Sequence, residues 1–256
     1  MNLETITPLI ITFNEDANIE RMLRKLAWAS RIVVIDSGST DRTRAILEAH
    51  ASVEIVERPF DTFAGQCNFG LSKITTPWVL SLDADYVLSD DLVEEMEALP
   101  EPAADVGGYS ASFVYVVHGR PLRATLYPPR TVLYRRAGAC YADFGHGHRV
   151  TAQGRVEALR HPIQHDDRKD LSRWFASQQR YALAEADYLL SRDPSELRRI
   201  DRLRLMAWPA PLLILGYTLI AKRCLLDGWP GWLYSLQRTC AEVMIALAVL
   251  ERRLKS

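Results

Sequence analysis

Strand-like and helix-like segments alternate over residues 6–82, and this order limits the folds open to the chain. Residues 6–13 and 31–35 are apolar and rich in β-branched side chains, which is typical of strands in a buried sheet. The segment between them has apolar residues at helical spacing, namely Ile19, Met22, Leu23 and Leu26. Strands joined through helices need crossover connections, which are right-handed in nearly all proteins. We therefore predict an α/β fold with a mostly parallel sheet and flanking helices.

Polar clusters follow the predicted strands. The pattern continues with a strand at 53–56, a helix at 63–74 and a strand at 78–82. In open α/β sheets, ligands bind beyond the carboxyl ends of the strands. We expect three clusters to meet at that edge of the sheet: Asn14-Glu15, residues 36–41, and residues 83–85. Their convergence predicts a ligand site there.

The third cluster contains two carboxylates, Asp83 and Asp85, directly after an apolar strand. A nucleotide diphosphate is an anion that aspartates alone would repel, so a divalent cation such as Mg²⁺ or Mn²⁺ is expected between them. Short acidic pairs at strand ends also occur as helix caps or solvated groups. The order of the surrounding elements, more than the pair itself, favours the metal site.

Four successive segments resemble the motifs of family 2 glycosyltransferases with the GT-A fold. They are T-F-N-E at 12–15, D-S-G-S-T-D-R-T at 36–43, N-F-G-L at 68–71 and L-D-A-D at 82–85. Within that family the chain looks closest to the bacterial lipopolysaccharide core β-glycosyltransferases, through P-R-T-V-L-Y-R-R at 129–136 and L-L-D-G-W-P-G-W at 225–232. The resemblance is strongest in the first hundred residues. It implies a Rossmann-like GT-A sheet and a hexosyltransferase activity.

The resemblance implies a donor site at the strand ends. Glu15 and Asp36 would accept hydrogen bonds from the nucleoside, and capping a helix is the alternative role for each. Gly38 lacks a Cβ, which allows the loop backbone to approach the ligand closely. Asp83 would lie near the sugar or ribose. The predicted nucleotide-sugar-binding residues are Thr12, Asn14, Glu15, Asp36, Gly38, Ser39, Asn68 and Asp83.

The chain departs from the family pattern at two places. Relatives often carry a further acid where this chain has Tyr86. They also usually show His-Glu before Arg-Val, and aligning Arg149-Val150 puts His148 where the acid is expected. A neutral imidazole can take the proton of an acceptor hydroxyl in an inverting transfer. We predict His148 as the catalytic base, with Asp143 as its rival, although G-H-G-H at 145–148 is also typical of a metal-binding or flexible loop.

A single histidine from the far side of the cleft commonly completes the metal site in GT-A enzymes. His165 stands next to Asp166-Asp167 and is our candidate for this ligand, with a solvated loop as the alternative. The predicted ligands for Mn²⁺ or Mg²⁺ are therefore Asp85, Asp83 and His165.

The acceptor side is expected after residue 100. Residues 109–117 and 131–134 are predicted strands, and the loop at 118–130 is rich in Arg and Pro. Arg120, Arg123 and Arg130 can bind acceptor phosphates bidentately. A solvated surface loop is an equal alternative for these arginines.

Composition narrows the partners. The 31 basic and 32 acidic residues give a net charge of −1, and there is no basic stripe with interleaved aromatics, so nucleic acid is not an expected partner. The four cysteines have no zinc spacing and indicate free thiols in a reducing compartment. Residues 1–5 have neither a basic region nor an apolar run, so no signal peptide is expected there. We expect the catalytic domain to face the cytoplasm.

From residue 171 the sequence becomes helical and amphipathic. Residues 192–204 hold five arginines among three acids, and they lead into an apolar stretch at 205–221 that Pro209 and Pro211 interrupt. Trp208 lies within this stretch, and further interfacial aromatics and basic residues follow it: Trp229, Trp232, Tyr234, Lys222, Arg223, Arg252, Arg253 and Lys255. We expect this region to lie in a membrane interface. Packing on the catalytic domain, or on a second copy in a homo-oligomer, is the alternative.

These interpretations combine into one prediction. Residues 1–170 form a GT-A catalytic domain, with a nucleotide-sugar half at 1–100 and an acceptor half at 101–170, and residues 171–256 form a helical membrane-interface region. The enzyme would be a metal-dependent inverting glycosyltransferase that moves a sugar from a nucleotide diphosphate donor, with UDP expected, to a lipid-linked glycan such as lipopolysaccharide core. It would be peripheral or monotopic at the cytoplasmic face of the inner membrane. Two alternatives remain: a polyprenyl-phosphate glycosyltransferase, and an inactive nucleotide-sugar-binding scaffold.

Overall fold

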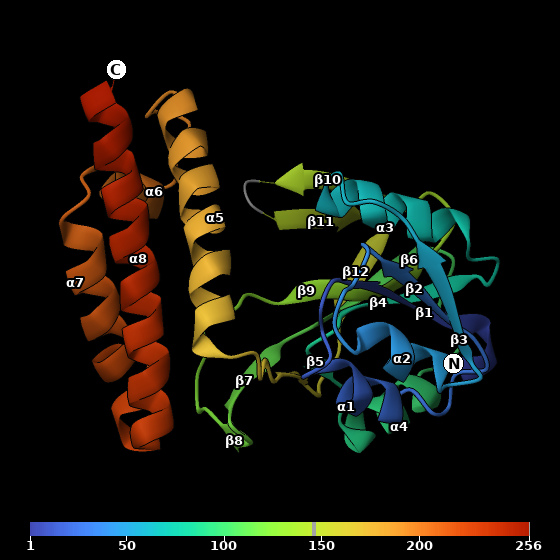
Figure 1. Cartoon of the computed structure of the whole chain (residues 1–256). Coiled ribbons are helices and arrows are strands. Elements are labelled where there is room, and N and C mark those ends of the chain that lie inside the picture. Colours follow the sequence, from blue (N-terminus) through green and yellow to red (C-terminus); the bar gives the residue numbers. More distant parts are fainter. Residues whose placement is uncertain (145–146, 256) are drawn as a thin grey trace. The chain divides into compact units, whose positions relative to one another are not determined.

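A computed structural model describes residues 1–144 and 147–255 of the chain (Figure 1). These residues divide into two compact units. The first unit contains Met1–Pro121 and Leu126–Arg168. The second contains Leu122–Thr125 and the chain from Lys169 onward.

The first unit is built on a large mixed sheet, in which the described residues form seven strands in the order β12-β6-β9-β4-β1-β2-β3. The strands are β1 (Ile6–Thr12), β2 (Ile32–Asp36), β3 (Val53–Glu57), β4 (Trp78–Asp83), β6 (Val106–Ala111), β9 (Arg130–Arg135) and β12 (Arg155–Ala158). Strands β1 to β4 pair in parallel, as does β12 with β6, while β9 runs antiparallel to both β4 and β6. The predicted α/β fold with a mostly parallel sheet is confirmed.

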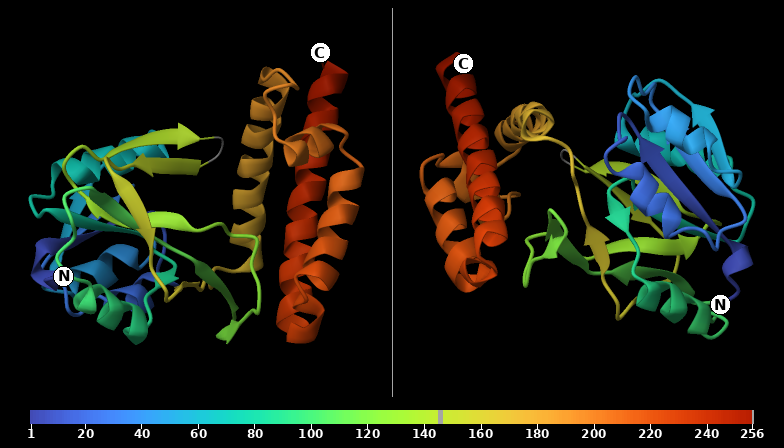
Figure 2. Two further views of the ribbon diagram at one scale, coloured as in Figure 1. Left: turned by 180° about the vertical axis from the view of Figure 1, so that it is seen from behind. Right: turned by 60° about the horizontal axis from the view of Figure 1, so that its bottom comes forward.

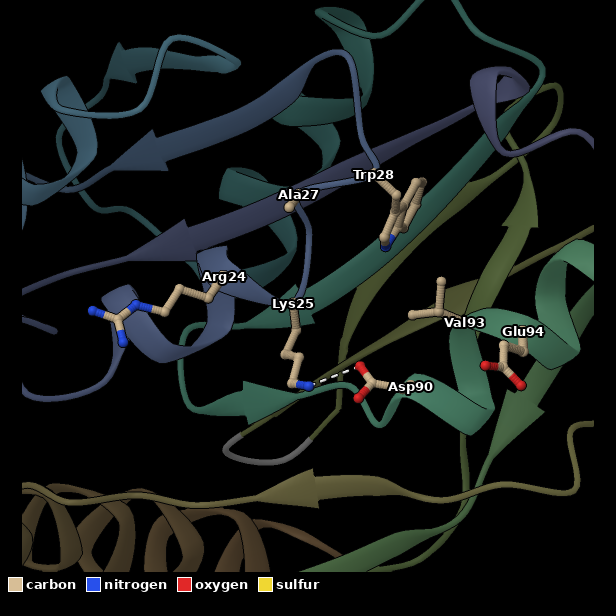
Figure 3. Close-up of a pocket in the computed structure, with 7 residues that line it drawn as sticks. All are labelled: Arg24, Lys25, Ala27, Trp28, Asp90, Val93 and Glu94. Atoms are coloured by element: carbon tan, nitrogen blue, oxygen red, sulfur yellow. Dashed lines mark hydrogen bonds and ion pairs between the residues drawn. The ribbon is translucent and has the colours of Figure 1, made fainter.

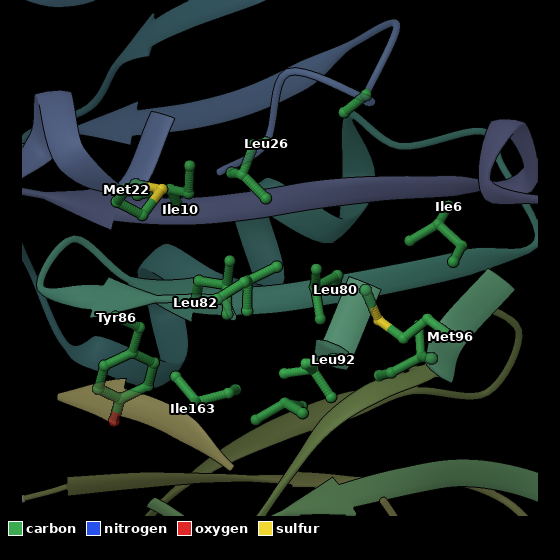
Figure 4. Packing of buried hydrophobic residues seen from close by; sticks show 14 of the residues in the cluster. Ile6, Ile10, Met22, Leu26, Leu80, Leu82, Tyr86, Leu92, Met96 and Ile163 are labelled. Carbon is green, nitrogen blue, oxygen red and sulfur yellow. The ribbon is translucent and has the colours of Figure 1, made fainter. Parts of the chain in front are cut away.

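Helices cover both faces of this sheet. They are the short 3₁₀ helix η1 (Leu3–Thr5) and the α-helices α1 (Ile19–Arg24), α2 (Thr43–Glu48), α3 (Phe63–Ser72) and α4 (Asp90–Ala98). Apolar residues alternate along the strands, so that Ile10 and Leu80 pack with α1 and α4, whereas Leu9 and Val79 pack with α3. Figure 4 shows the first of these two cores, in which Met22 and Leu26 lie over Ile10 and Leu82. Each fully buried Leu or Ile contributes about 1.5–3 kcal/mol to folding.

Side-chain caps begin two of these helices. The Thr62 hydroxyl accepts a hydrogen bond from the amide of Gly65 at the start of α3, and Ser89 does the same for Leu92 at the start of α4. Helix α2 begins after Asp41, whose Oδ1 accepts from the amide of Thr43 at 2.9 Å.

Two smaller sheets complete the first unit. One has the order β5-β13-β7-β8, formed by β5 (Tyr86–Val87), β13 (Ile163–His165), β7 (Phe113–Val117) and β8 (Arg120–Pro121). The other is the hairpin of β10 (Cys140–Phe144) and β11 (Gly147–Thr151). The single strand predicted at 109–117 is two strands, β6 and β7, which belong to different sheets.

The second unit is helical, as predicted for the C-terminal region. It contains α5 (Leu171–Ser191), α6 (Arg199–Leu205), α7 (Pro209–Gly216), the π-turn η2 (Tyr217–Ala221), the 3₁₀ turn η3 (Cys224–Asp227) and α8 (Trp229–Lys255). Helix α8 packs along both α5 and α7 (Figure 2). The apolar stretch predicted to be interrupted by prolines becomes α7 and η2, and Pro209 stands at the first position of α7, where its missing N–H costs nothing.

The core of the second unit combines apolar and charged groups. Ala186, Leu189 and Val249 are fully buried between α5 and α8. Beside them Arg204 of α6 donates to Glu185 at 3.0 Å and to Glu242 at 2.9 Å. Asp201 joins this network through Arg198 at 2.8 Å. Because the three carboxylates are at most 5% exposed, the arginines compensate most of their lost hydration.

Candidate functional site

The parallel register brings three predicted residues to one edge of the large sheet. Thr12 at the end of β1 is paired with Asp36 at the end of β2, and Ile11 is paired with Asp83 at the end of β4. All of these positions lie at the carboxyl ends of adjacent parallel strands. Thr12, Asp36 and Asp83 are therefore neighbours across the edge where ligands bind in folds of this type.

Asp36 organises the loop that follows β2. Its carboxylate is 2% exposed and accepts hydrogen bonds from the amides of Gly38 at 3.2 Å and Ser39 at 2.9 Å, and from the Ser39 hydroxyl at 2.5 Å. Gly38 has φ +87°, a conformation that other residues rarely adopt, and an added Cβ there would meet no atom within 4 Å. The loop backbone is thus fixed while Gly38 leaves open space beside it.

Asn14 and Glu15 connect the end of β1 to the same loop. The Oδ1 atom of Asn14 accepts from the amide of Thr40 at 2.7 Å, and the amide of Asn14 donates to the Ser39 hydroxyl at 2.8 Å. The amide of Glu15 donates to the Thr43 hydroxyl at 2.7 Å. Asn14 has φ +56°, which asparagine tolerates better than most residues. The nucleoside-binding roles predicted for this group remain predictions, and its geometry is that of a preorganised loop.

A polar link that the sequence did not reveal ties the chain after β13 to the start of α1. Asn18 donates from Nδ2 to Asp167 at 3.0 Å and accepts at Oδ1 from the amide of Arg168 at 2.9 Å. Arg21 donates to the carbonyl of Asp166 at 2.8 Å. These bonds fix His165, which immediately precedes Asp166. Nothing in the sequence pattern signals a pairing across about 150 residues.

Asp85 and His165, which the sequence predicts as metal ligands, form a close pair. Asp85 Oδ2 and His165 Nε2 are 3.1 Å apart, and each side chain is 14% exposed. Burial alone lowers the pKa of His165, but the Asp85 carboxylate outweighs it, so this pKa is raised above its ordinary value of 6.5. The other ring nitrogen, Nδ1, is buried and has no hydrogen-bond partner among the described residues.

This pair fits a small divalent cation that is completed by a ligand. Adjacent ligands of an octahedral Mg²⁺ or Mn²⁺ ion lie about 3 Å apart, close to the observed Asp85–His165 separation. Such ions commonly use one or two protein groups together with substrate phosphates. The described residues contain no cluster of three or more His, Cys, Asp or Glu side chains that could hold a metal, and the role of Asp83 as a third ligand stays a prediction.

The two candidate bases are neighbours. Asp143 and His148 stand directly opposite each other in the β10–β11 hairpin, which places their side chains on one face. The His148 ring stacks on Phe63 at 5.6 Å between centroids and lies 5.4 Å from the Tyr141 ring. Burial lowers the pKa of His148. The other histidine of the predicted G-H-G-H loop, His146, lies outside the described residues.

Helix α3 holds this hairpin in place. Asp143 Oδ1 accepts from the amide of Ala64 at 3.1 Å, at the positive end of the helix. Asn68 donates from Nδ2 to the carbonyl of Tyr141 at 2.9 Å and accepts at Oδ1 from the amide of the same residue at 2.8 Å. Asn68 is therefore engaged with the backbone of β10. Its predicted contact with the nucleotide sugar remains a prediction.

The three arginines predicted for the acceptor are not equivalent. Arg120 is exposed on β8, whereas Arg130 is half-buried at the start of β9. Arg123 belongs to the second unit, where its Nε donates to Asp227 at 3.0 Å. Arg120 and Arg130 thus lie in different sheets of the first unit, and the acceptor role of the three arginines stays a prediction.

A surface hollow of about 320 Å³ lies between α1 and α4 (Figure 3). It is lined by Arg24, Lys25, Ala27, Trp28, Asp90, Val93 and Glu94. Lys25 and Asp90 form an ion pair of 2.7 Å across it. None of the predicted site residues line this hollow, and the strand-end site is distinct from it.

Comparisons with known proteins agree with this architecture. The family model of Glycosyl transferase family 2 matches residues 8–160, more than half of the chain. The lipopolysaccharide core biosynthesis glycosyltransferase LpsC of Rhizobium meliloti is 30% identical over 108 residues, which cover 41% of this chain and 40% of that protein. An uncharacterized glycosyltransferase of Rickettsia bellii is 31% identical over 144 residues, 54% of this chain and 48% of that protein. The chain thus matches less than half the length of either relative.

A solved structure supports the fold. Staphylococcus aureus TarS 1–349, in complex with UDP-GlcNAc, superimposes with a TM-score of 0.50 and 15% identity, covering 98% of this chain and 92% of that one. At this identity the likeness concerns the fold alone. The resemblance drawn from the strand-end motifs is confirmed by the family match, which includes all four of them. The chain belongs to glycosyl transferase family 2.

Proposed function

We propose that this chain is a metal-dependent inverting glycosyltransferase that transfers a sugar from a nucleotide diphosphate donor, UDP-linked, to a lipid-linked glycan such as lipopolysaccharide core. The observation that carries the proposal is the Asp85–His165 pair at 3.1 Å, next to the strand ends that hold Asp36 and Asp83. The family match and the name of the Rhizobium meliloti relative support the reaction class and the acceptor.

Asp85 and His165 would hold Mn²⁺ or Mg²⁺, with Asp83 near the same charge. When bound, the cation neutralises the diphosphate that leaves with the electron pair of the broken glycosidic bond. The nucleoside would lie along Glu15 and Asp36, and the Gly38 backbone would approach it. The hydrogen bonds within this loop reduce the ordering that donor binding requires.

His148 would act as the base. It would take the proton of the acceptor hydroxyl while that oxygen attacks the anomeric carbon from the side opposite the departing diphosphate. The lowered pKa of His148 keeps its imidazole neutral and able to accept a proton at physiological pH. Asp143, directly opposite in the hairpin, would stabilise the imidazolium that forms.

The donor site is tested by isothermal titration of the chain with UDP, with and without Mn²⁺. We expect UDP to bind the wild type only with the metal, and Asp85→Ala to lose this binding while keeping its circular dichroism spectrum. Asp90→Ala, which removes an exposed carboxylate of the same unit, is the matched control. Equal UDP affinity without metal, or in Asp85→Ala, would contradict the metal site.

A polyprenyl phosphate is a second candidate acceptor. The observation that favours it is His148 in the place of the acid, because a phosphate nucleophile is already ionised and needs no strong base. Transfer to polyprenyl phosphate and to a glycan hydroxyl, compared in wild type and His148→Ala, separates the two. If His148→Ala loses transfer to the glycan but keeps transfer to polyprenyl phosphate, His148 serves the glycan acceptor as its base. If the wild type binds the donor but transfers sugar to neither acceptor, the chain is an inactive scaffold.

The second unit is proposed to lie in the interface of an anionic membrane, at the cytoplasmic face of the inner membrane. Its outer side chains are strongly apolar: Trp208 is 70% exposed, Ile220 75% and Leu247 61%. Helix α8 is the one described helix that is long and apolar enough to span a membrane. Because Glu242 of α8 is paired with Arg204 inside the unit, spanning would carry this network into hydrocarbon, which favours an interfacial position.

Vesicle sedimentation tests this placement. We expect the chain to bind vesicles of phosphatidylglycerol more tightly than phosphatidylcholine, because Lys222, Arg223 and Arg253 add positive charge. A variant with Trp229→Ser and Trp232→Ser should bind less, whereas Phe60→Ser, which removes an exposed aromatic ring of the first unit, should bind as wild type. If the chain instead forms a stable dimer in detergent-free buffer and binds neither kind of vesicle, the apolar face is covered by a second copy of the chain.

A further inference from the structure

We propose that Arg130 contacts the diphosphate of the donor as a second cation of the site, and that Tyr127 is the residue that positions it. This inference rests on the proposed function. It assigns Arg130 to the donor, in place of the acceptor contact that the sequence predicts for it together with Arg120.

The sheet register places Arg130 beside the acidic pair. Strand β9 is antiparallel to β4, with Leu133 opposite Leu80 and Tyr134 opposite Val79. The pairing with β4 ends there, next to a register shift of β9 against β6, and Arg130 lies close enough to Asp83 and Asp85 to interact with them electrostatically. Arg130 begins β9 at the edge where β4 ends, so it stands at the carboxyl ends of the parallel strands, where the donor is expected.

An aromatic group fixes the guanidinium. The Arg130 Cζ atom lies 4.7 Å from the centroid of the Tyr127 ring, within the range of a cation–π contact. The Tyr127 ring in turn packs edge-on against Phe113 at 4.9 Å and His165 at 5.1 Å. Its hydroxyl is hydrogen-bonded to that of Tyr86, which is 3% exposed. One tyrosine therefore touches both the arginine and the proposed metal ligand.

The charges around Arg130 suit a phosphate. Asp83 and Asp85 lie close enough to favour the charged form of Arg130, and a guanidinium is protonated at any physiological pH. A tyrosine side chain is neutral at physiological pH. Tyr86 thus adds no negative charge to compete with a phosphate for the guanidinium, as a carboxylate at this position would.

A guanidinium presents a planar set of N–H donors that matches two phosphate oxygens. When the bond between the anomeric carbon and the diphosphate oxygen breaks, its electron pair remains on that oxygen. Arg130 would donate hydrogen bonds to the diphosphate and offset this added charge. Arg120 is exposed on β8, in a different sheet, and it keeps the acceptor role that the sequence predicts.

Titration with UDP and UMP in the presence of Mn²⁺ tests the assignment, because the two ligands differ by the second phosphate. We expect Arg130→Ala to weaken UDP binding by about 10- to 100-fold and UMP binding much less. Arg130→Lys should weaken UDP binding less than Arg130→Ala does. Tyr127→Leu removes the ring, so the ratio of UDP affinity to UMP affinity should fall. Tyr127→Phe keeps the ring, so this ratio should stay as in the wild type. Arg155→Ala, which removes an exposed arginine of the same unit, is the control for net charge.

The outcomes separate this inference from the proposed function. Unchanged UDP affinity in Arg130→Ala, with a raised KM for the acceptor, would overturn the donor role while leaving the proposed function intact. A wild-type chain that binds neither UDP nor GDP with Mn²⁺ would overturn both. If Arg130→Ala fails to fold, the UDP-to-UMP ratios of Arg130→Lys and Tyr127→Leu decide, since wild-type ratios in both would exclude the contact.

Discussion

Replacing Asn68 with alanine should loosen the β10–β11 hairpin. The Asn68 amide makes two hydrogen bonds, of 2.9 and 2.8 Å, with the carbonyl and the amide of Tyr141. Each bond contributes about 0.5–1.5 kcal/mol, and a buried partner left unsatisfied costs about 1–3 kcal/mol. For a half-buried pair we expect a loss of about 2–3 kcal/mol, which lowers the Tm by roughly 4–10 °C in a chain of this size.

Hydrogen exchange locates the effect. The Tyr141 amide loses its acceptor in Asn68→Ala, so we expect the hairpin peptides to exchange faster by about 30-fold, as about 2 kcal/mol of local opening requires. Peptides from β1 and β2 should exchange as in the wild type. Ser72→Ala on the same helix, which removes an exposed hydroxyl bonded to the carbonyl of Phe69, is the matched control.

The same variant distinguishes two roles of Asn68. If Asn68 holds the hairpin, UDP affinity should be nearly unchanged while transfer falls, because His148 loses its fixed position on β11. If Asn68 binds the donor sugar, as the sequence predicts, affinity for the intact nucleotide sugar should fall without a change in Tm. Wild-type Tm and wild-type exchange in Asn68→Ala would refute the structural role worked out above.

Further predictions concern His148 and the second unit. Because burial lowers the folded-state pKa of His148, this residue favours unfolding as the pH falls below 6.5, and as the proposed base it should give kcat/KM an acidic limb with a midpoint below 6.5. His148→Ala should abolish that acidic limb. If the limb persists in His148→Ala, another group causes it. Arg204→Met should lower the Tm by an amount corresponding to about 3–5 kcal/mol, because Glu185 and Glu242 lose their shared partner, while UDP binding to the first unit is retained; calorimetry that finds an unchanged Tm would contradict the stabilising role of this network.

The strand-end site was predictable because its signal is local in the sequence. Apolar runs followed by polar clusters identified β1, β2 and β4, and the rule for parallel sheets then brought Asp36 and Asp83 to one edge. Only a family resemblance suggested that His165 lies near Asp85, and the metal-binding role of the pair stays a prediction. Hydrophobic periodicity predicts which residues form a strand. The rule for parallel sheets predicts that the ends of these strands lie at one edge.

The rest depended on contacts that no local pattern encodes. Strands β6 and β7 read as one apolar run, and they separate because each pairs with a different, distant partner, β9 and β13. The Asn68–Tyr141 bonds and the Asn18–Asp167 bond join residues 73 and 149 positions apart. Asn68 lies in a family motif, so a ligand role was the natural interpretation, and only the fold reveals the backbone it contacts. The cation–π contact between Arg130 and Tyr127 was not predicted either, because no local pattern encodes it.

The second unit buries charged side chains beside its apolar core and exposes large apolar side chains. Its interior contains Glu185, Asp201 and Glu242 around Arg204, whereas large apolar residues such as Trp208 and Ile220 lie outside. In water, this apolar surface would be left in contact with solvent, and the hydrophobic effect would favour covering it. The internal ion pairs have a different consequence: they join α5, α6 and α8 through charge, in addition to the apolar contacts of Ala186, Leu189 and Val249. If the outer face contacts lipid, we expect the ion pairs to help the unit keep its internal structure, because hydrocarbon offers no partners that compete for them.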